Sequence, residues 1–169
     1  MIDVLIVDGY NILNGWPELA KLSEESLEHG RDKLIEILAN WRGLCGNQVI
    51  VVFDAHLVRG GVQTSEVVDG IQVIYTPEGV TADQAIEKMV QKIPDGLSVY
   101  VATSDYIEQR LIFGKGAYRL PARELRKLVY STLQDNRRQI TLNRPGPTLD
   151  ARLPAELRRV LEEWRRQKS

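Results

Sequence analysis

Short apolar runs that end at an acidic residue recur along the chain. The runs at residues 4–8 (VLIVD) and 49–54 (VIVVFD) each close with an aspartate, and the run at 97–102 (LSVYVA) leads into Thr103-Ser104-Asp105. Continuous apolar runs are typical of strands buried on both faces of a parallel sheet, whereas half-buried strands alternate. The pattern therefore predicts strands that enter one parallel sheet and carry polar residues at their carboxyl ends.

Between these runs, apolar residues recur with the period of a helix. We expect helices from a cap at Ser23 to about Gly43, from a cap at Thr81 to Lys92, over 107–113, from Pro121 onward, and over about 154–167. Asp69-Gly70 lies between stretches rich in β-branched residues and favours a tight hairpin. Strands that alternate with helices predict an α/β fold with a mostly parallel sheet.

The chain is expected to form a single domain. No linker is long enough to separate two domains, and no internal repeat is visible. We assign residues 1–142 to the main domain. Residues 143–169, a loop rich in proline followed by a basic helix, are expected to pack on the same domain.

Composition excludes several classes of protein and reveals an asymmetry of charge. The 169 residues are 43% hydrophobic and 27% charged, with Cys45 as the single cysteine, which excludes a disulfide scaffold and a disordered chain. No secretory signal or membrane-spanning run is visible, so we expect a cytoplasmic protein. Residues 1–109 hold 7 basic and 17 acidic residues, whereas 110–169 hold 15 and 6. A basic part that binds a polyanion explains this split, and so does a merely solvated arginine-rich surface.

Four aspartates are expected to meet at one edge of the sheet. Parallel strands deliver Asp8, Asp54 and Asp105 to their common carboxyl edge, and Asp83 lies in the first turn of a following helix. Clustered carboxylates stay ionised together when a cation lies among them, and hard divalent ions such as Mg²⁺ accept oxygen ligands. Each acid also has a structural alternative, as a strand-end turn, a helix cap or a partner of a helix dipole.

Other phosphate chemistries lack their motifs. The chain holds no glycine-rich GxxxxGKS or GxxxxGKT loop and no GxGxxG after the first strand. Asp8-Gly9-Tyr10 also lacks the second aspartate that an aspartyl-phosphate phosphatase carries two residues on.

The order of these motifs resembles the NYN domain, in its YacP-like branch. The segments that carry the resemblance are Asp8-Gly9-Tyr10-Asn11, Val52 to His56, Thr81-Ala82-Asp83, Ala102 to Tyr106, Gly114 to Ala117, and Ala122 to Leu125. The resemblance implies a PIN-like three-layer sandwich, with helices on both faces of the sheet. It also implies an endoribonuclease that depends on Mg²⁺ or Mn²⁺, and the branch is associated with cleavage of messenger RNA on the ribosome.

The resemblance also implies roles for particular residues. Asp8, Asp83 and Asp105 would bind the metal, Asn11 and Asp54 would support the acids, and Thr103 and Ser104 would orient water or phosphate. Val80 stands where this branch has an acid beside Thr81.

Basic residues of the second half are candidates for binding RNA. Arg119, Arg123, Arg126 and Lys127 recur at nearly helical spacing, so they are expected to share one face. Two rival functions remain open at this point: a non-catalytic RNA- or ribosome-binding module that kept the acids, and a small-molecule phosphohydrolase. The sequence predicts no membrane or DNA partner, and it leaves the oligomeric state open.

Overall fold

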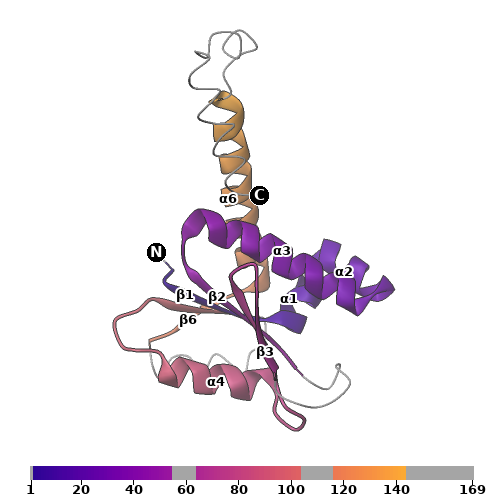
Figure 1. Cartoon of the computed structure of the whole chain (residues 1–169), viewed down its shortest axis with the longest axis vertical. Coiled ribbons are helices and arrows are strands. Elements are labelled where there is room, and N and C mark those ends of the chain that lie inside the picture. The colour runs from indigo at the N-terminus through magenta and orange to yellow at the C-terminus, as the bar shows by residue number, and fades with distance from the viewer. Residues whose placement is uncertain (1, 55–63, 104–115, 144–169) are drawn as a thin grey trace, which may run out of the picture. The chain divides into compact units, whose positions relative to one another are not determined.

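A six-stranded sheet forms the centre of the molecule, and the computed structural model describes residues 2–54, 64–103 and 116–143 (Figure 1). The strands are β1 (Val4–Asp8), β2 (Gln48–Phe53), β3 (Thr64–Val68), β4 (Ile71–Tyr75), β5 (Val99–Ala102) and β6 (Tyr118–Leu120). The helices are α1 (Gly9–Gly15), α2 (Pro17–Glu25), α3 (Leu27–Cys45), α4 (Ala82–Lys92) and α6 (Ala122–Leu142).

The strand order is β3-β4-β2-β1-β5-β6, and every neighbouring pair is parallel except β3 with β4. β1 lies between β2 and β5, with Leu5 opposite Val49 on one side and Tyr100 on the other. The α/β architecture with a mostly parallel sheet, expected from the apolar runs, is confirmed.

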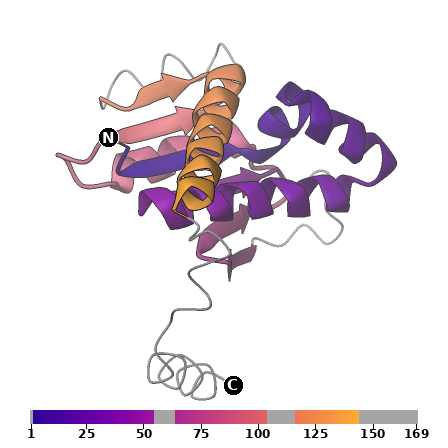
Figure 2. The ribbon, with the colours of Figure 1, turned by 90° about the horizontal axis from the view of Figure 1, so that it is seen from above.

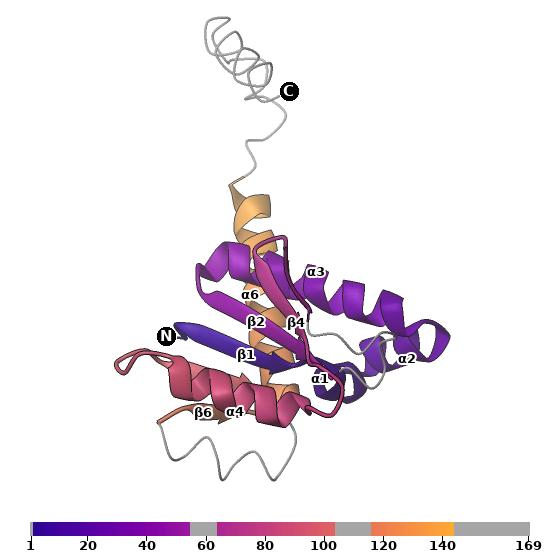
Figure 3. The ribbon, with the colours of Figure 1, turned by 60° about the horizontal axis from the view of Figure 1, so that its bottom comes forward.

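Alternate residues of the strands feed two apolar layers on opposite faces of the sheet. One layer joins Leu5, Val7 and Phe53 to residues of α1, α2, α3 and the first turns of α6. The other layer joins Val4 and Ile6 to the inner side of α4. Figure 3 shows α3 and α4 on either side of the sheet, as expected for helices that cover both faces.

Two local predictions are confirmed. Asp69 and Gly70 have φ angles of 49° and 82°, and they form the tight turn between β3 and β4. Thr81 caps α4, its side chain accepts a hydrogen bond from the Gln84 N–H, and the Gln84 side chain accepts one in return from the Thr81 N–H.

The region between β1 and α3 differs from the prediction. No helix was expected before Ser23, but Gly9 begins α1 directly after β1, and Pro17 then begins α2. Ser23 was expected to cap the next helix. It lies inside α2, where its hydroxyl donates to the Leu19 carbonyl, and Ser26 caps α3 by accepting from the His29 N–H. The prediction was wrong because Pro17 starts a helix earlier than the apolar periodicity suggested.

A buried hydrogen bond and an ion pair attach α2 to the start of α6. The indole Nε1 of Trp16 donates to the Ala122 carbonyl at 2.8 Å. The Arg126 Nε donates to Glu18 at 3.0 Å, and the Tyr130 hydroxyl donates to the same carboxylate at 2.8 Å. These contacts fix α6 on the layer that contains α1 and α2, where α6 adds Leu125 and Val129 to the core.

The ionisation of Glu18 and Tyr130 reflects this contact. Burial raises the pKa of Glu18, but hydrogen bonds from Arg126 and Tyr130 outweigh it, so the pKa lies below its ordinary value of 4.5. Burial and the hydrogen bond to Glu18 together raise the pKa of Tyr130 to about 12. Both shifts favour the ionised Glu18 carboxylate that accepts from the protonated Tyr130 hydroxyl.

The chain separates into two compact units, Met1–Leu133 and Gln134–Ser169. Figure 2 shows β5 and β6 beside β1 in the first unit. The second unit begins within α6, and its described residues are 134–143. The helices expected over 107–113 and 154–167 lie outside the described residues. So does most of the segment 143–169, and its expected packing stays a prediction. No described helix is long and apolar enough to cross a membrane.

Gly9 allows α1 to pass closely over β2, which makes it a sensitive position. A Cβ at Gly9 would overlap the ring of Phe53, which is fully buried. Gly9→Ala should therefore lower the free energy of unfolding by about 1–3 kcal/mol in urea denaturation, although alanine favours a helix. Gly43→Ala in α3 is the matched control, because its Cβ would meet no atom within 4 Å and should be neutral or stabilising. Equal effects of the two changes would contradict the close-approach argument.

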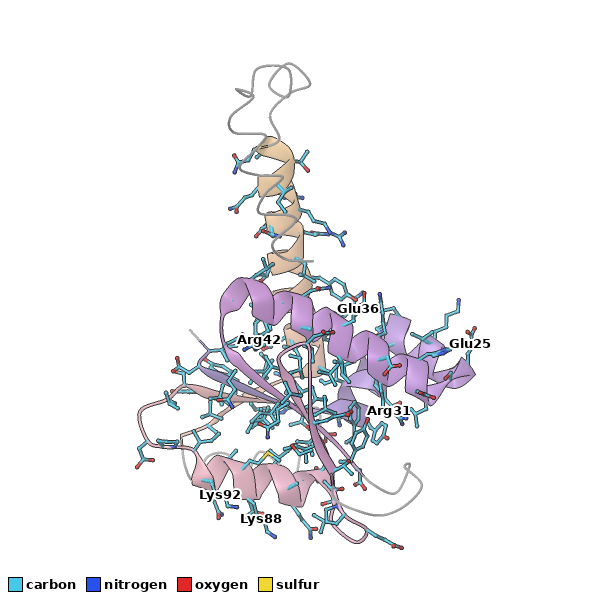
Figure 4. All side chains as sticks on the ribbon, in the orientation of Figure 1. Glu25, Arg31, Glu36, Arg42, Lys88 and Lys92 are labelled. Carbon is cyan, nitrogen blue, oxygen red and sulfur yellow. The ribbon has the colours of Figure 1, made fainter. Side chains whose placement is uncertain are left out.

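Glu18→Gln tests the contact between α2 and α6. It should lower the free energy of unfolding by about 1 kcal/mol at neutral pH, since a paired carboxylate is lost. The pKa of Glu18 is lower in the folded state than in the unfolded state. Its carboxylate therefore stabilises the folded protein fully at pH values above the unfolded pKa, and this stabilisation is lost as the pH falls through the folded pKa. Urea denaturation should therefore show a difference that shrinks below about pH 4.5. Glu25→Gln at the exposed end of α2 is the control, and a pH-independent difference for Glu18 would oppose the prediction (Figure 4).

Candidate active site

Polar residues follow each of the four central parallel strands at the carboxyl edge of the sheet. β1, β2, β4 and β5 run in the same direction, so their last residues meet at one edge. The polar residues at these strand ends are Asp8, Asp54, Thr76 and Thr103. The residue two places before each of them belongs to the apolar layer beneath α4; these are Ile6, Val52, Ile74 and Val101. Because side chains alternate along a strand, the polar residues face the α4 side as well.

Asp8 is the most central of these polar residues. It is the last residue of β1, the strand between β2 and β5, and only 8% of its surface is exposed. It precedes the first turn of α1 without using its side chain to cap that helix. Asn11 lies three residues on in α1 and is half-buried. The end of β1 therefore presents a carboxylate and an amide, the two oxygen donors that the sequence singled out there.

Asp54 brings the amino end of α4 to the same edge. Its Oδ2 accepts a hydrogen bond from the Ala82 N–H at 3.4 Å, so the carboxylate lies at the positive end of the α4 dipole. Asp83 is in the first turn of that helix and is half-buried. Two acids from distant parts of the chain thus meet at this helix end, and the backbone amides there offset part of their charge.

Thr76 holds the loop that leads into α4, and the sequence argument overlooked it. Its hydroxyl donates to the Val80 carbonyl at 2.7 Å, its N–H donates to the Phe53 carbonyl at 3.0 Å, and it is 1% exposed. Val80, where an acid was expected, therefore contributes its backbone to the loop. Thr76 follows the apolar run of β4 just as Asp8 follows β1, and that repeated pattern was the available signal.

The remaining strand-end residues are partly outside the described residues. Thr103 is fully buried after β5, and its N–H donates to the Leu120 carbonyl at 3.2 Å. Ser104 and Asp105 lie outside the described residues, so the expected position of Asp105 stays a prediction.

The donors at this edge suit a hard divalent cation in their chemistry. They are carboxylate oxygens of Asp8, Asp54 and Asp83, with the Asn11 amide three residues after Asp8 and the Thr103 hydroxyl directly after β5. Within residues 2–54, 64–103 and 116–143, no three His, Cys, Asp or Glu side chains converge closely enough to hold a metal. The metal site therefore stays a prediction, and it requires the fourth acid, Asp105, or movement of those described.

The basic residues divide between a strand and a helix. Arg123 and Lys127 are exposed on α6 and lie four residues apart, so they share a face as expected. Arg126 pairs with Glu18 instead and lies 5.1 Å from the Tyr130 ring centre. Arg119 was expected on the same helical face, but it belongs to β6, opposite Val101, and its buried Nε has no hydrogen-bond partner among the described residues. That expectation was wrong because α6 begins at Ala122, after Pro121.

Comparisons with known proteins agree with this arrangement. The chain is 42% identical to the "Uncharacterized protein YacP" of Bacillus subtilis (strain 168), over 98% of each chain. It also matches the crystal structure of Rae1 (YacP) from B. subtilis, with a TM-score of 0.74, 41% identity, and coverage of 98% of this chain and 95% of that one. A crystal structure of a single-substitution mutant of the same protein matches with a TM-score of 0.73, 40% identity and 89% coverage of both chains. The family profile of the YacP-like NYN domain matches residues 5–166. The chain belongs to the YacP-like NYN domain family.

Proposed function

We propose that this protein is a divalent-metal-dependent endoribonuclease that cleaves messenger RNA in association with the ribosome. Membership of the YacP-like NYN family supports a nuclease-like, RNA-related role. The observation that carries the proposal is that Asp8 ends β1 and Asp54 follows β2 at the carboxyl edge of the sheet, where Asp54 accepts from the first amide of α4, the helix whose first turn carries Asp83. That is the edge at which open α/β sheets bind ligands.

Asp8 and Asp83, with Asp105, would hold Mg²⁺ or Mn²⁺. When bound, such an ion lowers the pKa of a coordinated water and offsets negative charge on the phosphoryl oxygens of a phosphodiester. The half-buried and buried settings of Asp83 and Asp8 suit this role, because carboxylates shielded from water interact more strongly with a cation.

The protein's own groups would orient the substrate. Asp54 accepts from the first amide of α4 and so fixes the position of Asp83 relative to β2. The Asn11 amide can donate to a phosphate oxygen or to a neighbouring carboxylate, and Thr103 and Ser104 would orient water or phosphate. No nucleophilic side chain is required, since water attacks phosphorus in line with the leaving oxygen.

The exposed cations of α6 would bind the RNA backbone. Arg123 and Lys127 share a face of α6, and neither is held by an ion pair with another described residue. Contacts between cations and phosphates are independent of sequence and release counterions. This face would therefore increase affinity for RNA without selecting a cleavage sequence.

Asp8→Asn and Asp83→Asn test the acids. Each change removes a charged ligand but keeps the shape of the side chain, so cleavage of a labelled messenger RNA should fall by orders of magnitude. Unfolding stability should stay level or rise, because repulsion between carboxylates is relieved. Asp95→Asn is the matched control, since Asp95 is exposed in the turn between α4 and β5.

The cleavage assay is run with and without ribosomes and with Mg²⁺ or Mn²⁺. Cleavage that needs ribosomes supports the full proposal, and cleavage of free RNA supports a ribonuclease without that partner. Saturable metal binding lost in Asp8→Asn assigns the ligand independently of activity. RNA or ribosome binding with neither cleavage nor metal binding would instead establish the non-catalytic module.

Arg123→Gln combined with Lys127→Gln tests the basic face. The slope of log affinity against log salt should fall by about 1–1.5, because a single-stranded phosphate contact contributes about 0.7 each. Lys88→Gln combined with Lys92→Gln removes the same charge from the outer side of α4 and is the control (Figure 4). Metal titration should be unchanged in both double variants. Identical slopes for the two would show that the face on α6 is only solvated.

A further inference from the structure

An aromatic cluster with one arginine lies at the same edge of the sheet, on the face opposite α4. The ring centres of Tyr10 and Phe53 are 5.1 Å apart, and those of Phe53 and Tyr75 are 5.5 Å apart in a stacked arrangement. Arg31 of α3 donates from a terminal nitrogen to the Tyr10 hydroxyl at 3.2 Å. Figure 4 shows Arg31 on the part of α3 near the carboxyl ends of the strands.

The cluster is only partly a core feature. Phe53 is fully buried and forms its base, whereas Tyr10, Arg31 and Tyr75 each keep part of their surface exposed. Within the described part of the chain, Arg31 makes one side-chain hydrogen bond and no ion pair. A guanidinium has five N–H donors, so most of its donors stay available.

Two of the three partly exposed members adjoin the acidic edge along the chain. Tyr10 follows Asp8 by two residues in α1, and Tyr75 directly precedes Thr76. Burial raises the pKa of the Tyr10 hydroxyl, Arg31 opposes that shift, and the Asp54 carboxylate adds to it, so Tyr10 lies within the field of the candidate site. An RNA strand bound at the acids therefore needs to cross only the end of β1 or β2 to reach these rings.

We propose that Tyr10, Arg31 and Tyr75 form a subsite for one nucleotide of the RNA strand, adjacent to the acidic site. The base packs on the exposed parts of the tyrosine rings, and Arg31 binds the phosphate attached to it. This inference rests on the proposed function for the identity of the ligand as RNA.

The chemistry of the cluster favours single-stranded RNA. Unstacked bases pack on aromatic side chains whatever their sequence, and arginine binds phosphate with two parallel hydrogen bonds. Asp32 and Glu66 place negative charge near Tyr75, and Arg31 is the cation that opposes it there. The affinity for a phosphate at this position therefore depends on Arg31 more than on the general surface charge.

A purely structural reading makes a different prediction. In that reading, the hydrogen bond from Arg31 to Tyr10 only joins α3 to α1. Loss of the bond would then lower stability without changing affinity for RNA. Comparison of Arg31→Gln with Tyr10→Phe separates the two, because both remove this hydrogen bond but Tyr10→Phe keeps the guanidinium and the ring that packs on Phe53. Only Arg31→Gln should weaken RNA binding if the subsite exists, and neither should if the bond is purely structural.

The experiment measures binding of a labelled single-stranded oligoribonucleotide over a series of salt concentrations. It uses the full chain carrying Asp8→Asn, so that the RNA is not cut during the measurement. Arg31→Gln should weaken binding about tenfold and reduce the salt slope by about 0.7, since one phosphate contact is lost. Lys33→Gln is the matched control, because Lys33 is an exposed cation of the same helix that pairs with Glu36.

Two tyrosine variants complete the test, each checked by thermal unfolding. Tyr75→Leu should weaken binding about fivefold or more with an unchanged salt slope, because it removes a stacking surface but no charge. Tyr10→Phe should leave affinity within about threefold, since stacking is retained. Arg31→Gln carries the test on its own if Tyr75→Leu does not fold.

The outcomes separate this inference from the proposed function. Equal affinities and slopes for Arg31→Gln and Lys33→Gln would overturn the subsite, while cleavage by the unmodified chain would still support the nuclease. If Arg31→Gln and Tyr75→Leu weaken RNA binding as expected but the unmodified chain cleaves no RNA, the subsite is supported and the nuclease is overturned. Absence of RNA binding by every variant and by the unmodified chain would overturn the subsite, and the nuclease would then be decided by the cleavage assay with ribosomes.

Discussion

The position of β1 between two parallel partners determines where the candidate site forms. β1 pairs with β2 and β5 along nearly its whole length, and its apolar residues pack on both faces of the sheet. The pleat puts Ile6 and Asp8 on the α4 side and Val7 on the other. A slip of one residue would exchange the two faces and carry Asp8 away from α4. Burial on both faces makes that slip costly, so the strand register also determines on which side of the sheet Asp8 lies.

The start of α4 depends on the same edge for its position. Thr76 and Asp54 follow neighbouring strands, and they bond to Val80 and Ala82 at the two ends of the turn into the helix. The capping box at Thr81 then satisfies the first amides of α4. Asp83 is therefore positioned through strands that are remote from it in sequence. The first turn of α4, which carries Asp83, lies at the edge because the helix begins there.

The sequence was sufficient for features that repeat or that have a strong local signal. The apolar runs before Asp8 and Asp54 revealed central strands, and Asp69-Gly70 and Thr81 identified a hairpin and a helix cap. Features with weak local signals were missed. β6 has three residues, too few for a periodic pattern, so Arg119 was assigned to the helix after it. The cluster of Tyr10, Arg31 and Tyr75 joins segments whose proximity depends on tertiary packing and on no spacing visible in the chain.

The charge distribution places a constraint on how the proposed function operates. The acidic edge repels a phosphodiester, so an RNA strand needs cations beside the acids to approach them. Within the described residues, Arg31 supplies positive charge on the α3 face, and Arg123 and Lys127 supply it on α6. A metal among the carboxylates would offset the remaining repulsion at the edge itself. Affinity for RNA and affinity for metal are therefore expected to rise together, because each reduces the electrostatic cost of binding the other.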